Sequence, residues 1–339
     1  MDASRRVVPM MSMAYRNPGR AVLHLARAAA LAPSPHNSQP WFFAEEGHDH
    51  GFEIHTDAAR RLTWTDPGGR QTVIAGGAAL FNVRIAVRQL GFRPVVDVLP
   101  ALGRPGYLAR VGFGPYASAT EDEARMARAI GHRRTRRGPF LPGRLPTTLL
   151  DDLREHARAE GADLEAVDTS DRLATLAELV RTAEDRHRAD PIHVAELARC
   201  VGPWGLPAAM CRIPPDLTLL AGRDYLGAAH RYVLPAGNRR AGTGAVLVLS
   251  TPGDGPADWL RAGQALQRVL LHAAAHDVMA AFHTQPLELS DTRGQVRARL
   301  TPGRFPQMVL RLGHTAPAAA VPRRPLADLL VRDRATAGR

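Results

Sequence analysis

Residues 32–41, APSPHNSQPW, gather an unusual density of polar groups with fixed shapes. The prolines fix φ and remove backbone donors, while Ser34, Asn37, Ser38 and Gln39 carry hydroxyl and amide groups on short side chains. Trp41 adds a large apolar anchor where a strand is expected to begin. A rigid loop of this kind suits a planar polar ligand better than proton-transfer chemistry. The plainer alternative is a heavily capped turn between a helix and a strand.

A second group of chemically capable residues lies about a hundred positions further on, in HRRTRRGPF at 132–140. The guanidinium groups of Arg133 and Arg137 offer paired donors that match phosphate oxygens. Thr135 places a hydroxyl between them. In an arginine-rich chain the same residues could form a solvated basic turn. Taken with APSPHNSQPW, however, they indicate the second half of a single binding site.

Alternating helices and strands must position these two motifs. Residues 20–32 are alanine-rich and favour a helix, which the prolines that follow would end. Two strands, 41–46 and 51–57, are expected around a turn, and a long helix over 71–92. Further along the chain, strands are predicted at 95–100, 107–114, 162–168, 244–251 and 305–314, and helices at 146–161, 172–190, 258–278 and from Glu121. The Pro- and Gly-rich residues 200–222 are expected to form a long loop.

The two halves of the chain repeat one pattern. AGGA at 75–78 and AGQA at 262–265 each precede an apolar helix of similar length that turns into a strand. A helix, a break and a strand also recur, but the break is EGADLEA at 160–166 in the second copy. Two helix–strand units can align loosely by chance. The favoured interpretation is a duplicated α+β fold in which only one copy kept the polar loop.

Composition narrows the class of protein. The chain has 339 residues and a formal net charge of +11, and every basic residue in that count is arginine. Because arginine codons are GC-rich, the charge points to a GC-rich genome more than to a polyanionic partner, and it is spread along the chain. No apolar run is long enough for a membrane span, and the N-terminus does not resemble a secretory signal. Two cysteines, Cys200 and Cys211, fit a reducing cytoplasm.

Several other groups of residues give only weak signals of a site. His48, Asp49, His50 and His55 surround an expected turn, where polar residues are common. A pair of histidines, His272 and His276, has ligand spacing on a helix but no evident third ligand. Cys200 and Cys211 lack C-x-x-C spacing. No G-x-G-x-x-G follows a strand, and neither a P-loop nor a hydrolase elbow is present. No metal is therefore expected.

The two motifs resemble those of the nitroreductase family, whose members bind FMN. APSPHNSQPW resembles the family's PS-x-x-N-x-QPW loop, and HRRTRRGPF resembles its R-x-S-x-R motif. In that family the flavin lies at a homodimer interface to which each subunit supplies one motif. Here both motifs lie on one chain, which is similar to the Acg-type proteins of actinobacteria, fused pseudo-dimers. The resemblance extends from about residue 20 to the C-terminus. It implies a nitroreductase-like α/β sandwich that is duplicated within one chain, so that the two halves interlock as a pseudo-dimer. The chain itself is then expected to be a monomer.

The resemblance also implies roles for individual residues. Arg133 would bind the FMN phosphate, Thr135 the ribityl–phosphate chain, and Arg137 would lie near flavin N1 and O2. A cation beside N1 would stabilise the reduced anionic flavin. The remaining implied contacts are Pro33, Ser34, Pro35, Asn37 and Gln39 along the ribityl chain and ring, Pro286, Leu287 and Glu288 near N5, Arg323 and Arg324 at the phosphate, and Asn238 as a ring contact.

These expectations define a function. The first half is expected over 1–122 and the second over 123–339, with a lid-like insertion at about 190–225. One half lacks the polar loop and the other lacks the arginine motif, so one FMN per chain is expected. The chain is predicted to be an NAD(P)H-dependent flavin oxidoreductase for a small nitro- or quinone-type acceptor, with its chemistry at flavin N5 and no catalytic side chain. The alternatives are a non-catalytic protein that sequesters FMN beneath a lid, and a basic nucleic-acid-binding protein.

Overall fold

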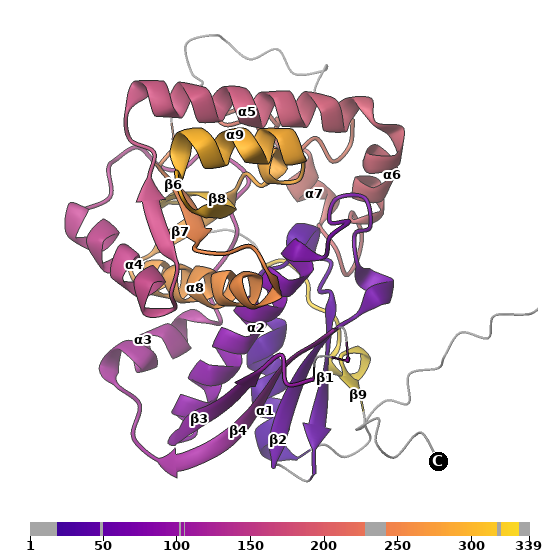
Figure 1. The fold of residues 1–339 in the computed structure, drawn as a ribbon, viewed down its shortest axis with the longest axis vertical. Coiled ribbons are helices and arrows are strands. Elements are labelled where there is room, and N and C mark those ends of the chain that lie inside the picture. The colour runs from indigo at the N-terminus through magenta and orange to yellow at the C-terminus, as the bar shows by residue number, and fades with distance from the viewer. Residues whose placement is uncertain are drawn as a thin grey trace, which may run out of the picture.

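The computed structural model describes residues 19–47, 50–101, 103–104, 106–227, 242–316 and 320–331. These residues form two largely antiparallel sheets with two long helices, α2 (Arg70–Gln89) and α8 (Pro256–Ala275), packed against each other between them (Figure 1). The α+β class expected from the sequence is confirmed. No helix in the described ranges combines the length and the apolar character needed to cross a lipid bilayer.

The first sheet is built from the N-terminal half. Helix α1 (Arg20–Ala30) leads through a short 3₁₀ turn, η1 (Pro35–Asn37), into the hairpin of β1 (Trp41–Glu46) and β2 (Gly51–Thr56). After α2, the strands β3 (Phe92–Val98) and β4 (Tyr107–Tyr116) follow. The strand order is β3-β4-β2-β1-β9, in which the last strand comes from the C-terminus.

The second sheet repeats this connectivity. Helix α4 (Thr147–Ala159) precedes β5 (Asp163–Ala166) and β6 (Ala245–Thr251), and α8 precedes β7 (Val278–Phe282) and β8 (Phe305–His314). Its order is β5-β6-β8-β7, the same arrangement of first, second, fourth and third strands as β1-β2-β4-β3. The matching order supports the predicted duplication, because a repeated unit would place its four strands in the same order.

The repeated small residues lie where α2 and α8 cross. A Cβ added to Gly77 would come 2.2 Å from Leu260 O, and one added to Gly263 would come 2.0 Å from Ile74 O. Each glycine therefore lets the backbone of the other helix approach, three residues before its partner glycine. The sequence comparison paired Gly76 with Gly263, whereas the structure pairs Gly77 with it, one position further on.

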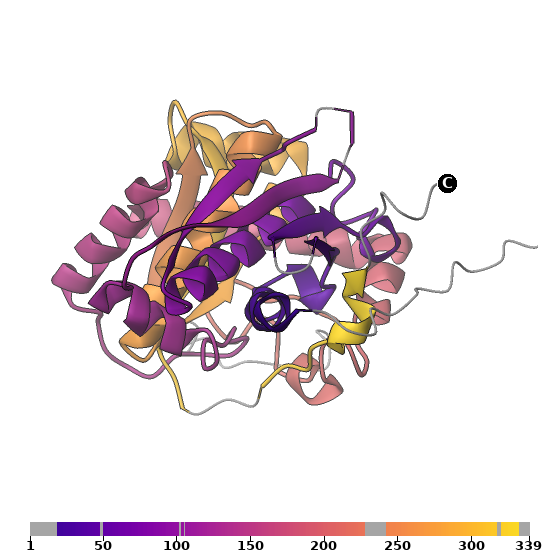
Figure 2. The same cartoon turned by 90° about the horizontal axis from the view of Figure 1, so that it is seen from below.

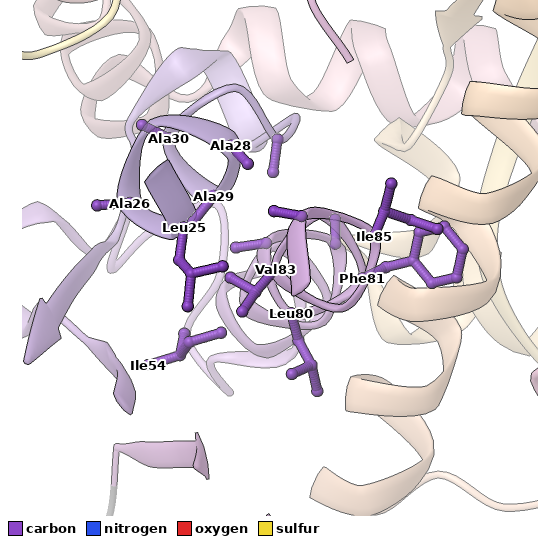
Figure 3. Close-up of a cluster of buried hydrophobic side chains, with 14 of the residues drawn as sticks. Leu25, Ala26, Ala28, Ala29, Ala30, Ile54, Leu80, Phe81, Val83 and Ile85 are labelled. Carbon is purple, nitrogen blue, oxygen red and sulfur yellow. The ribbon is translucent and has the colours of Figure 1, made fainter. Parts of the chain in front are cut away.

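Apolar side chains on α1 and α2 form the core of the first half (Figure 3). Leu25 of α1 and Val83 of α2 point into the space between the two helices, and Ile54 of β2 approaches from the sheet. Phe81 and Ile85 lie on another side of α2 and point toward α8. All of these side chains are almost fully buried, so α2 is packed on several faces and has little freedom to move.

The second half carries a long insertion between two strands of its sheet. Strands β1 and β2 are joined by residues 47–50, whereas their counterparts β5 and β6 are separated by 167–244. This segment, called the insertion below, contains α5 (Ser170–Ala189), α6 (Pro191–Arg199) and the short α7 (Ala208–Cys211). The predicted lid-like insertion at about 190–225 lies within this segment and begins where α5 ends, and its role as a lid stays a prediction.

The C-terminal segment interlocks the two halves. Strand β9 (Leu330–Val331) pairs in parallel with β1, and Phe43 N donates to Leu329 O at 2.7 Å. Figure 2 shows this segment, in yellow, beside α1 of the first half. Between β7 and β8 the chain forms η4 (Gln285–Leu287) and α9 (Ser290–Leu300). Neither α9 nor α6 was predicted from the sequence.

The predicted boundary between residues 122 and 123 would fall in the first turn of α3 (Glu121–Ala129), and the division into two domains stays a prediction. Three residues discussed from the sequence, Asn238, His48 and Asp49, lie outside the described residues.

Candidate functional site

The loop between α1 and β1 has an unusual backbone. Three residues without glycine's freedom adopt positive φ angles: His36 at 50°, Asn37 at 61° and Gln39 at 50°. Such conformations cost free energy and persist only where the surroundings hold them. Gln39 N donates to Ser34 Oγ at 3.0 Å across the turn. The loop is therefore a fixed shape, as its prolines suggested.

The amide side chains of this loop fasten distant segments. Asn37 Nδ2 lies 3.0 Å from Trp204 O and 2.9 Å from Gly205 O, both in the insertion. Gln39 Nε2 donates to Trp204 O at 2.9 Å, and Gln39 Oε1 accepts from Arg324 N at 2.9 Å. The amide side chains of Asn37 and Gln39 therefore join the loop to the insertion and to the C-terminal segment. This role was not predicted from the sequence.

Two adjoining pockets open beside the loop. The larger has mostly apolar walls from α2, η1, β7, β8 and the insertion. The smaller lies between the end of α1, the arginine motif and the C-terminal segment. They are called the large pocket and the arginine pocket below. Both pockets are lined by Pro33, Ser34, Thr135 and Arg137, so one elongated ligand could occupy both.

The arginine pocket is strongly basic. Its lining contains Arg133, Arg134, Arg137 and Arg323, and no Asp or Glu among the described residues. Burial, followed by repulsion from Arg323 and Arg134, lowers the pKa of Arg133 to about 9. Its Nε is buried without a hydrogen-bond partner, and its other bonds, to Thr135 Oγ1 and Leu31 O, are 3.4 Å long. An anion in this pocket would relieve the repulsion and satisfy the free donors.

The predicted site residues separate into three groups. Those that line one or both pockets are Pro33, Ser34, Pro35, Asn37, Arg133, Thr135, Arg137 and Arg323. Those that line neither pocket are Gln39, Arg324, Pro286, Leu287 and Glu288. Asn238 is outside the described residues. Gln39 and Arg324 take part in the hydrogen bonds that join the loop to the insertion and the C-terminal segment. The residues of η4 lie next to His283 and Thr284, which do line the large pocket.

Glu288 anchors a buried ion pair behind the large pocket. Its carboxylate accepts from Arg223, from Thr284 Oγ1 at 3.0 Å and from Gln71 Nε2 at 3.2 Å. Burial alone would lower the pKa of Arg223, but the carboxylates of Glu288 and Glu184 outweigh it and raise that pKa. Arg223 belongs to the insertion, so this pair fixes the insertion against η4.

Several residues that line the large pocket were not predicted from the sequence. His36 and Tyr225 meet there, with His36 Nδ1 2.8 Å from the Tyr225 hydroxyl. Gln71 is the second residue of α2, and Arg311 lies within β8. Gln71 could have been suspected from its position at a helix N-terminus. The others come from strand interiors or irregular segments, where no spacing rule distinguishes them.

The position related to this site by the helix crossing is filled. Ala75 and Ala78 of α2 line the large pocket and leave it room. Counted from the paired glycines, their counterparts on α8 are Arg261 and Gln264, both large. Arg261 also packs against the break after α4, since a Cβ on Gly161 would lie 2.8 Å from its Cδ. The asymmetry expected from the sequence therefore extends to the helices.

A cluster of Asp122, His156 and His272 lies away from both pockets, with candidate ligand atoms within 4.8 Å of one another. Arg268 Nε donates to His156 Nδ1 at 3.0 Å. Because a guanidinium only donates, the neutral His156 ring carries its proton on Nε2 and has no lone pair for a cation. His276, which has ligand spacing from His272 in the sequence, donates from Nδ1 to His272 O at 3.0 Å. The cluster gives no support for a metal.

The described residues thus form an α+β protein with two sheets of matching strand order, a large pocket, and a basic pocket that adjoins it. No model of a known protein family matches the chain. The Mycobacterium tuberculosis protein "Uncharacterized protein Rv3127" is 34% identical over 320 residues, which cover 89% of this chain and 90% of that protein. "Putative NAD(P)H nitroreductase acg" of the same organism is 31% identical over 311 residues, covering 89% and 92%.

A third relative, "Putative NAD(P)H nitroreductase Rv3131" of M. tuberculosis, is 32% identical over 323 residues, covering 92% of this chain and 90% of that protein. The chain therefore belongs to the nitroreductase superfamily and, within it, to the Acg-type proteins. Among solved structures, the FMN-dependent nitroreductase NfnB from Mycobacterium smegmatis in complex with NADPH is 22% identical and covers 60% of this chain and 96% of its own, with a TM-score of 0.39.

Proposed function

We propose that this chain is an FMN-dependent oxidoreductase that takes electrons from NAD(P)H and passes them to a small nitro- or quinone-type acceptor. The observation that carries this is the joining of a large, mostly apolar pocket to a pocket lined by four arginines and no carboxylate among the described residues. A planar apolar ring system with a phosphate tail matches that pair of pockets in shape and in charge.

Each pocket has a distinct task in this proposal. Arg133 and Arg323 line only the arginine pocket and would hold the phosphate. Thr135 and Arg137 line both pockets and would hold the connecting chain and the polar edge of the ring. FMN, when bound, supplies the hydride chemistry, and the protein orients the ring and sets the charge around it. The insertion would exclude water from the ring.

The proposal is tested by comparing FMN with riboflavin, which has the same ring and no phosphate. Binding of each to flavin-free protein is followed by fluorescence quenching. The variants Arg133→Gln and Arg323→Gln should weaken FMN binding about 10- to 100-fold, as expected for loss of a charge-assisted hydrogen bond, and leave riboflavin binding nearly unchanged. Arg186→Gln is the matched control, because Arg186 pairs with Asp291 on the surface. Failure of wild-type protein to bind FMN would refute the proposal.

A second function, sequestration of FMN without turnover, is favoured by the wall that the insertion makes. The insertion residues that line the large pocket are Met210, Cys211, Ile213, Pro215, Gly222, Arg223 and Tyr225. Stopped-flow reduction by NADPH distinguishes the two functions. An oxidoreductase reduces its flavin with the insertion intact. Sequestration predicts that flavin stays oxidised until residues 195–220 are shortened, in a variant shown by circular dichroism to remain folded.

A further inference from the structure

Arg311 is a buried cation in the wall of the large pocket. It lies in the middle of β8 with 1% of its surface exposed. Its Nε donates to His283 Nε2 at 2.7 Å, and its Nη1 lies 3.0 Å from Thr243 O. The guanidinium also lies 5.1 Å from the centre of the Phe140 ring. These contacts hold the group in one orientation, but every partner is neutral.

No carboxylate compensates this charge within the described part of the chain. Arg311 takes part in no ion pair there, in contrast to Arg223, which meets Glu288. His283 adds no negative charge, because it donates from Nδ1 to Ala221 O at 3.0 Å and accepts at Nε2. Burial, without an opposing carboxylate, lowers the pKa of Arg311 to about 10. A buried cation of this kind is costly unless an anion joins it.

The position of Arg311 separates it from the proposed phosphate site. Arg133 and Arg323 line only the arginine pocket, whereas Arg311 lines only the large pocket. No Asp or Glu among the described residues lines the large pocket. Among the described residues, the hydrogen bonds of Arg311 come from Nε and Nη1. The charge that would satisfy it must arrive at the ring end of the site.

We propose that Arg311 binds the anionic group of the small acceptor, so that the site selects carboxylate-bearing acceptors over neutral ones of the same shape. This inference rests on the proposed function for the identity of the acceptor, but the binding preference can be measured without turnover. A carboxylate matches the guanidinium in geometry and removes the cost of its burial, which an uncharged amide does only in part. Arg311 is thereby a specificity residue.

The test compares 4-nitrobenzoate with 4-nitrobenzamide, which share a nitroaromatic ring and differ in charge. Dissociation constants are measured by calorimetry on wild-type protein and on Arg311→Gln, both loaded with FMN and oxidised. Wild-type protein should bind 4-nitrobenzoate at least 10-fold more tightly than the amide. Arg311→Gln should lose that preference and change amide binding less than 2-fold. Arg311→Lys should keep part of it, and Arg186→Gln should keep all of it.

Two outcomes would overturn the inference. One is equal binding of the two compounds by wild-type protein. The other is a parallel loss of both in Arg311→Gln, or a weakened FMN affinity or altered flavin potential with the preference intact, since either places Arg311 at the cofactor or in the framework. If FMN itself fails to bind, the proposed function falls separately, and the same calorimetric comparison on flavin-free protein still decides whether Arg311 selects the anion.

Discussion

Arg323 Nη1 donates a hydrogen bond of 2.6 Å to Asn37 Oδ1, joining residues 286 positions apart in the chain. Asn37 Nδ2, which carries two hydrogens, lies 2.9–3.0 Å from the carbonyl oxygens of Trp204, Gly205 and Pro322. One side chain thus connects the loop, the insertion and the C-terminal segment. The polar loop lines the pocket and also holds the insertion and the C-terminal segment in place. Its residues therefore affect ligand binding through these two segments as well as directly.

Replacing Asn37 by Ala should loosen that fastening. Gly205 O would lose its side-chain donor, while Trp204 O and Pro322 O would each lose one of two donors. At about 1 kcal/mol for each lost hydrogen bond, the free energy of unfolding should fall by about 1–3 kcal/mol. FMN affinity should fall about 10-fold because Arg323 loses its acceptor. Hydrogen exchange at residues 200–206 should become faster. Denaturant titration, flavin titration and exchange mass spectrometry check these results.

Ser38→Ala is the matched control for Asn37→Ala, because Ser38 lies in the same loop and its hydroxyl makes no hydrogen bond with a described residue. It should leave stability and FMN affinity within experimental error. If Asn37→Ala were equally silent, the network would be incidental. If it abolished folding, the loop would be a purely structural turn.

The sequence was sufficient to predict the long helices, most strands and the α+β class, because apolar periodicity and proline breaks mark them directly. It also indicated that Ser34 and Thr135 belong together, and the structure places both in the walls of the same pockets. It could not reveal Arg223 or Arg311, since one lies in an irregular segment and the other looks like any strand residue. The sequence comparison aligned Gly76 with Gly263, one position away from the true contact at Gly77. AGGA contains two glycines, and only the packing of the helices shows which of them faces α8.

One FMN should bind to each chain. The alanines that open the large pocket on α2 have Arg261 and Gln264 as their counterparts on α8. Gln264 Oε1 accepts from Arg84 at 2.8 Å, and Arg84 also pairs with Glu160, so the equivalent space is occupied by bonded side chains. Flavin absorbance after denaturation, divided by protein concentration from amino-acid analysis, should give a ratio near one. A ratio near two would show that the second position is open.

Gly263→Ala should destabilise the protein strongly. The added methyl group would lie 2.0 Å from Ile74 O and 2.8 Å from Gly77 Cα, which are backbone atoms that cannot move aside alone. The two helices must separate, and we expect a loss of about 3 kcal/mol or more, as for overpacked cores. Thermal and denaturant unfolding measure the effect.

Gly294→Ala provides the control for that substitution. Gly294 also lies within a helix, α9, but a Cβ there would meet nothing within 4 Å. Alanine should therefore stabilise the protein slightly, by up to about 1 kcal/mol, through its helix propensity. Similar losses in both variants would mean that helix propensity or flexibility, and not the contact between α2 and α8, determines the result.

Stability should decrease as the pH falls below about 6.5. Burial, followed by nearby arginines, holds the pKa of His36 and of His283 well below the usual value. In this pH range the unfolded chain binds protons that the folded chain excludes, so unfolding becomes easier as the pH drops, while above it both states are neutral and the effect vanishes. Each histidine should contribute about 1.4 kcal/mol per pH unit once the pH is well below 6.5. Denaturant titrations at pH 7, 6 and 5 measure the slope of the unfolding free energy against pH. The variant His283→Gln, which keeps an acceptor for Arg311, should reduce this slope by the contribution of one histidine, about 1.4 kcal/mol per pH unit. An unchanged slope in that variant would show that His283 becomes protonated in the folded protein.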